Sequence, residues 1–125
     1  MLNCGDTFYA GDTEDDEPHL SVIITPPDEG EVVTVTVTTL RLRSEKLVRL
    51  NKADHPFIRH ESVIAYSYSR IRAVDEIESA IQSGNATLRE PVTPELLKRI
   101  RMGLRDSDFT PNGVRHFYES LKIEE

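Results

Sequence analysis

The chain has 125 residues, of which 38% are apolar and 30% are charged, and its formal net charge at pH 7 is −7. This size and balance predict one folded domain and exclude two full ones. No apolar run approaches the roughly 18 residues of a membrane span, and the first residues lack the basic and apolar regions of a secretory signal. The single cysteine, Cys4, forms neither an internal disulfide nor a zinc-binding thiolate cluster. We therefore expect a cytoplasmic protein without metal or other cofactor.

The charge is unevenly distributed along the chain. Residues 1–31 hold nine carboxylates and no Lys or Arg, whereas residues 41–72 hold eight basic side chains against three acidic ones. The negative net charge argues against a general nucleic-acid coat protein, but the basic segment 41–72 is suited to binding phosphate. The acidic run Asp12–Glu17 is interpreted either as a solvated loop or as a loop that folds over this basic segment.

Short runs of β-branched and aromatic residues, separated by Gly, Pro and Asp, predict four or five strands in the first half. In residues 32–40 valines alternate with threonines, which places valines on the core face and hydroxyls on a wetter face. The predicted strands are Thr7–Ala10, His19–Thr25, Val32–Leu40, Lys46–Leu50 and Val63–Tyr68, the last continuing irregularly to Val74.

Helical spacing replaces strand alternation after Val74. A first short helix is predicted from there to a left-handed stop at Gly84-Asn85. Thr93-Pro94-Glu95 predicts a capped helix start, and Thr110-Pro111 repeats that signal for a helix running to the C-terminus. Its apolar stripe indicates either core packing or an interface, and consists of Val114, Phe117, Tyr118 and Leu121.

These elements predict a mainly β fold with α additions, a small and partly open β-barrel with a C-terminal pair of helices. We expect the barrel domain to span residues 1–106. Residues 107–125 would then form a helical extension packed on the same domain.

An ordered series of short motifs extends over about residues 5–105. It comprises Gly5-Asp6, the strands at Leu20–Thr25 and Val32–Thr38, Ser62–Ile64 leading to Arg70–Asp75, and the capped helix containing Leu96–Leu104. This series resembles the PemK/MazF family, the toxin half of bacterial toxin–antitoxin pairs. The resemblance implies an SH3-like barrel that forms a homodimer, binds an antitoxin protein and cuts single-stranded RNA without metal.

The implied reaction is attack of the RNA 2′-hydroxyl on the adjacent phosphate. It needs a proton acceptor, a proton donor for the leaving 5′-oxygen and hydrogen bonds to the phosphate. The family's Thr position falls on Thr38, and its Arg position falls on His19. We therefore expect His19 and Thr38 to be catalytic, with substrate bound by Thr39, Arg41, Arg43, Arg59, His60 and Arg70.

His19 is the main departure from the family pattern. An imidazole is better matched than a guanidinium to proton transfer at neutral pH, but it is poorer at holding phosphate in a bidentate manner. The missing Arg and the acidic loop leave an alternative, in which the barrel has lost nuclease activity and acts as a protein-binding or regulatory module.

A second pair of histidines lies close together in the sequence. His55 and His60 flank Pro56, and their spacing of five residues does not place both on one helix face. We therefore expect a structured loop with Phe57 and Ile58 in the core, rather than a metal site. His60 would lie near the cleft, in contact with substrate or a dimer partner.

Overall fold

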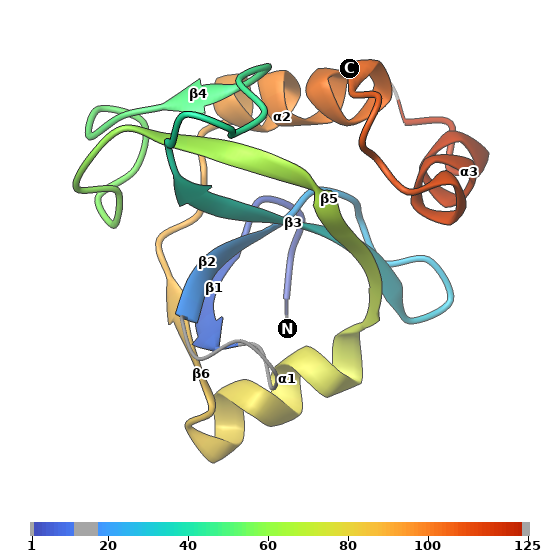
Figure 1. Cartoon of the computed structure of the whole chain (residues 1–125). Helices are drawn as coiled ribbons and strands as arrows, with labels where there is room; N and C mark the ends of the chain where they lie inside the picture. Colours follow the sequence, from blue (N-terminus) through green and yellow to red (C-terminus); the bar gives the residue numbers. More distant parts are fainter. Residues whose placement is uncertain (1, 12–17, 124–125) are drawn as a thin grey trace.

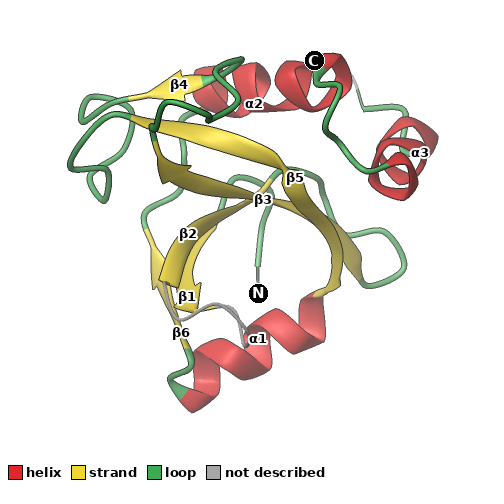
Figure 2. Ribbon diagram, in the orientation of Figure 1, coloured by secondary structure: helices red, strands yellow, loops and turns green. Residues whose placement is uncertain are grey.

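A curled, six-stranded antiparallel sheet forms the centre of the protein (Figures 1 and 2). The computed structural model describes residues 2–11 and 18–123. In these residues the sheet has the order β4-β5-β3-β2-β1-β6 and is accompanied by three helices. The strands are β1 (Thr7–Gly11), β2 (Pro18–Ile23), β3 (Glu31–Thr39), β4 (Arg49–Leu50), β5 (Ser62–Ala73) and β6 (Ala86–Arg89). The prediction of a mainly β fold with helices is confirmed.

Strand β3 follows from its alternating sequence. Val33, Val35 and Val37 all lie in the larger core, as the alternation predicts. The other face of β3 is more buried than expected, since Val32 is 1% exposed and Thr34 is 4% exposed. The first half of β3 is therefore buried on both faces.

The curl of the sheet arises within β5. This strand pairs with β3 in two stretches, and the register shifts between them, so that Thr36 faces Ala65 whereas Thr34 faces Arg70. The extra residues form a bulge, which bends a strand and increases its twist. As a result the two halves of β5 run in different directions, and the sheet wraps into a half-barrel (Figure 1).

Three helices cover the sheet, with α2 and α3 on one side and α1 (Val74–Ser83) on the other (Figure 1). Helix α1 ends at Gly84, whose φ of 87° is left-handed and disfavours other residues, as the sequence predicts. Helix α2 (Pro94–Asp106) begins as predicted, with the Thr93 hydroxyl accepting a hydrogen bond from the Leu96 amide at 3.2 Å. Helix α3 spans Asn112–Ser120.

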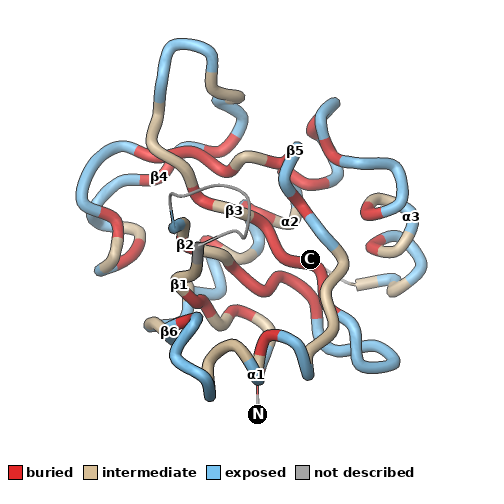
Figure 3. Tube along the Cα trace, turned by 60° about the horizontal axis from the view of Figure 1, so that its bottom comes forward, coloured by how far each residue is buried: buried red, intermediate tan, exposed pale blue. Residues whose placement is uncertain are grey.

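Two apolar clusters lie on opposite faces of the sheet, and buried residues follow the central strands (Figure 3). The larger cluster joins β2, β3 and β5 to α2 and also includes Val114 and Tyr118 of α3. The smaller cluster lies against α1 and consists of Leu2, Phe8, Ile23, Val32, Ile77 and Ala86. The C-terminal stripe therefore packs in the core at Val114 and Tyr118.

Three elements differ from the sequence predictions. The predicted strand Lys46–Leu50 is reduced to Arg49–Leu50, because only these residues pair with β5. Strand β6 was not predicted; its four residues are held by pairing with β1. Thr110 does not cap α3, because its hydroxyl donates to the Leu104 carbonyl at 2.9 Å and Pro111 occupies the cap position.

None of the helices in the described ranges combines the length and apolar character that crossing a bilayer requires.

Candidate active site

A cleft of about 310 Å³ opens where the sheet divides. The pairing of β2 with β3 ends at Leu20 and Val37. Beyond this point β2 remains paired with β1 as far as Pro18, and β3 remains paired with β5 as far as Thr39. Two pairs of strands, β1–β2 and β3–β5, thus form separate arms, and the cleft lies between them. Its polar lining consists of His19, Thr38, Thr39, Arg59, His60 and Ser62, and its apolar lining includes Tyr9, Leu20, Val37, Phe57 and Ile58.

His19 and Thr38, the two expected catalytic residues, lie on opposite arms at the start of the cleft. Continuing the β2–β3 register by one residue places them across from each other. Both side chains are partly exposed and line the cleft. An imidazole and a hydroxyl from different strands therefore border the same opening.

His60 and Thr39 form the second polar pair. The His60 Nε2 lies 3.0 Å from the Thr39 Oγ1. The backbone of His60 is also anchored, because its carbonyl accepts a hydrogen bond from the Ser62 hydroxyl at 3.0 Å. Next to it, the Leu40 amide donates to the Glu61 carbonyl at 3.0 Å. The ring of His60 is exposed yet held in place at the end of β3.

His55 has a structural role in the loop that carries Phe57 to His60. Its Nδ1 accepts a hydrogen bond from the Phe57 amide at 3.0 Å, so Nε2 carries the proton and donates to the Glu90 carbonyl at 2.5 Å. His55 is only 2% exposed. Because both ring nitrogens are used, this histidine has none to offer a metal ion, and no group of three or more potential metal ligands occurs in residues 2–11 and 18–123.

Aromatic contacts join this loop to the other arm of the cleft. The rings of Phe57 and Tyr9 have centroids 4.5 Å apart. The Arg89 guanidinium also contacts this phenylalanine, at 4.6 Å from the centroid of the Phe57 ring, which is within cation–π distance. Phe57 and Ile58 pack on the larger core, as expected from the sequence.

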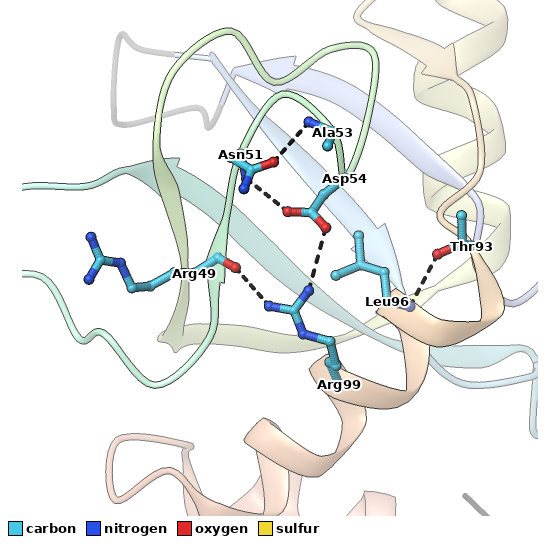
Figure 4. Close-up of polar contacts among 7 residues, drawn as sticks. All are labelled: Arg49, Asn51, Ala53, Asp54, Thr93, Leu96 and Arg99. Carbon is cyan, nitrogen blue, oxygen red and sulfur yellow. Dashed lines mark hydrogen bonds and ion pairs between the residues drawn. The ribbon is translucent and has the colours of Figure 1, made fainter.

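Arg99 of α2 fixes the beginning of the same loop (Figure 4). It donates to the Arg49 carbonyl at 2.8 Å and pairs with Asp54 at 3.4 Å. The other oxygen of Asp54 accepts from the Asn51 amide at 2.8 Å, and the Asn51 side chain accepts from the Ala53 amide at 2.9 Å. The loop that lines the cleft is thereby tied to α2, which packs one face on the larger core.

Replacing Arg99 with alanine should lower the free energy of unfolding by about 1 kcal/mol, because a charge-assisted hydrogen bond and a half-exposed ion pair are lost together. Amide hydrogen exchange should become faster in residues 51–60. Lys98→Ala, an exposed change at the preceding position of α2, is the matched control and should leave exchange in this loop unchanged. Equal exchange in the two variants would contradict the role assigned to Arg99.

The expected basic residues are divided between the cleft and other surfaces. Arg59 lines the cleft. Arg41 and Arg43 lie in the exposed segment after β3 and are not among the cleft-lining residues. Arg70 faces Thr34, four residues along β3 from Thr38, which corresponds to roughly 13 Å of strand. Only Arg59, of these four arginines, borders the opening.

The acidic run Asp12–Glu17 lies outside the described residues, although its neighbour Pro18 lines the cleft.

Cys4 is not among the residues that line the cleft. Its Sγ accepts a hydrogen bond from Arg101 at 2.8 Å. Burial raises the pKa of the Cys4 thiol despite the opposing charge of Arg101, so sulfur at this position is a thiol rather than a thiolate at neutral pH.

Seven residues that line the cleft were not predicted from the sequence as members of the site: Tyr9, Pro18, Leu20, Val37, Phe57, Ile58 and Ser62. The periodic pattern gave no reason to distinguish Tyr9 from other strand residues. Its place in the cleft depends on contact with a loop almost fifty residues later.

No protein-family model matches the chain, and no curated protein matches its sequence. The cleft itself combines two imidazoles, threonine hydroxyls and a guanidinium. Such groups can move protons near neutral pH and donate hydrogen bonds to phosphate oxygens.

Proposed function

We propose that the protein is a PemK/MazF-like toxin, a metal-independent endoribonuclease that cleaves single-stranded RNA by attack of the 2′-hydroxyl. The observation that carries this proposal is the cleft in which His19 and Thr38 border one opening from two strands. In this function the curled half-barrel is an SH3-like barrel, active in the cytoplasm, forming a homodimer and restrained by an antitoxin protein.

The roles follow from the chemistry of the groups. His19 accepts the proton of the 2′-hydroxyl, because a neutral imidazole has a nitrogen lone pair that can take up a proton. The Thr38 hydroxyl donates a hydrogen bond to a nonbridging phosphate oxygen as negative charge develops there. Arg59, at the edge of the same cleft, supplies a positive charge for the phosphate.

The test is an end-group assay on a random-sequence single-stranded RNA with purified protein in EDTA. Wild-type protein should leave 2′,3′-cyclic phosphate and 5′-hydroxyl ends. His19→Ala should reduce the cleavage rate by about 10²–10⁴-fold, the usual contribution of a positioned acid or base. Thr38→Val should reduce it by about tenfold or more, because a hydrogen bond to a charged group is lost.

His116→Ala is the control, since this exposed residue of α3 does not line the cleft. It should cleave as fast as wild type. If wild-type protein cleaves nothing at any salt concentration and causes no growth arrest when expressed, the endoribonuclease proposal fails. The inactive barrel acting as a protein-binding or regulatory module then becomes the better description. Cleavage that persists unchanged in His19→Ala would remove His19 from the mechanism.

A further inference from the structure

Two of the four histidines border the same cleft. His55 uses both ring nitrogens inside the protein, and His116 lies on the exposed side of α3. His19 and His60 both line the cleft, but they come from different arms of the divided sheet. In the proposed reaction His19 accepts the proton of the 2′-hydroxyl, and the 5′-oxygen that leaves still needs a proton donor.

The geometry of His60 suits a proton donor. Its Nε2 is 3.0 Å from the Thr39 hydroxyl, and no hydrogen bond to its Nδ1 is found within the described ranges. When the ring is protonated, Nε2–H donates to Thr39 Oγ1 and Nδ1–H is available to a substrate atom. The Ser62 hydroxyl fixes the backbone of His60, so the ring is aimed from an anchored position.

The surrounding charges agree with this assignment. The charged group that lines the cleft beside His60 is Arg59, which is suited to binding phosphate rather than to proton donation, because a guanidinium is too weak an acid to give up its proton readily. Glu61 follows His60 in the chain, and its carboxylate pairs with Arg49 at 3.4 Å. An imidazolium is therefore the strongest acid among the cationic groups at this end of the cleft.

We propose that His60 is the general acid of the reaction and that Thr39 positions its ring; this inference rests on the proposed ribonuclease function. As the 2′-oxygen forms its bond to phosphorus, His19 takes the 2′-hydroxyl proton. The bond from phosphorus to the 5′-oxygen breaks, and that oxygen takes the Nδ1 proton of His60. The products are a 2′,3′-cyclic phosphate and a 5′-hydroxyl, and proton exchange with water restores both rings.

The experiment compares two leaving groups. Cleavage by wild-type protein of a random-sequence RNA first locates a cut site, and an oligonucleotide is then made with sulfur in place of the bridging 5′-oxygen at that site. A thiolate leaves without being protonated, so this substrate does not need a general acid. His60→Ala should slow cleavage of the oxygen substrate by about a hundredfold or more and cleavage of the sulfur substrate by less than about tenfold.

His19→Ala is the comparison, because loss of the base should slow both substrates to a similar extent. Thr39→Val should also slow cleavage of the oxygen substrate more than cleavage of the sulfur substrate, but by a smaller factor than His60→Ala. Thr39→Ser keeps the hydroxyl and should cleave the oxygen substrate at the wild-type rate. If His60→Ala is as active as wild type, or loses activity by the same factor on both substrates, His60 is not the general acid. The ribonuclease proposal then still stands. Wild-type protein that cleaves neither substrate would overturn both proposals.

Discussion

Replacing Gly103 with alanine should lower the free energy of unfolding by about 2–3 kcal/mol. A Cβ atom at this position would overlap the Tyr66 hydroxyl and would lie 2.7 Å from both Tyr66 Cζ and Val48 Cγ2. Tyr66 cannot easily move, because it is fully buried and its hydroxyl donates to the Ile100 carbonyl at 2.8 Å. Burial also raises the pKa of Tyr66, which keeps the hydroxyl protonated as a donor. Overpacking of a filled core therefore outweighs the gain of about 1 kcal/mol that alanine usually brings to a helix interior.

Gly113→Ala provides the matched control in α3. No atom lies within 4 Å of a Cβ built at this position, so the same substitution should raise the free energy of unfolding by up to about 1 kcal/mol. Urea unfolding followed by far-ultraviolet circular dichroism measures both variants. Changes of the same sign in the two proteins would contradict the close packing described between α2 and β5.

His55→Ala should lower the free energy of unfolding by about 3 kcal/mol. The change empties a buried site and removes the hydrogen bonds to the Phe57 amide and the Glu90 carbonyl. Glu90 keeps its second donor, the Thr7 hydroxyl at 2.7 Å, whereas the Phe57 amide loses the acceptor described for it. An unsatisfied buried donor and a cavity each cost about 1–3 kcal/mol.

His116→Ala, at an exposed position, should change stability by less than about 0.5 kcal/mol under the same conditions. The two histidine variants can be compared by thermal or urea unfolding at pH 7.5. A His55→Ala protein as stable as His116→Ala would show that the loop from Phe57 to His60 does not depend on the imidazole.

Local sequence patterns predicted the parts of the fold that depend on local physics. The alternation around Val35 identifies β3, and Thr93-Pro94 marks the start of α2, because burial periodicity and end-capping act over a few residues. Strand β6 gives no comparable signal, since its short sequence becomes a strand only by pairing with β1 about eighty residues away. The shortness of β4 likewise depends on its partner β5.

The candidate site, too, was predicted from the sequence only in part. His19 and Thr38 came from a resemblance in the order of strands, and the two residues do border one cleft. The contact between His60 and Thr39 joins residues 21 positions apart and depends on how the intervening loop folds back. Arg70 was expected near substrate, but the bulge in β5 shifts its register toward Thr34. A bulge of this size leaves no clear mark in the sequence.

Beyond Leu20 and Val37, no strand pairing within the described residues joins β2 to β3 across the cleft. Each arm keeps its own pairing there, β1 with β2 and β3 with β5. The contact between Tyr9 and Phe57 crosses this gap. His19 on one arm and Thr38 on the other are therefore held relative to each other by loop contacts, among them the contact of Tyr9 with Phe57, as well as by the sheet pairing that ends at Leu20 and Val37.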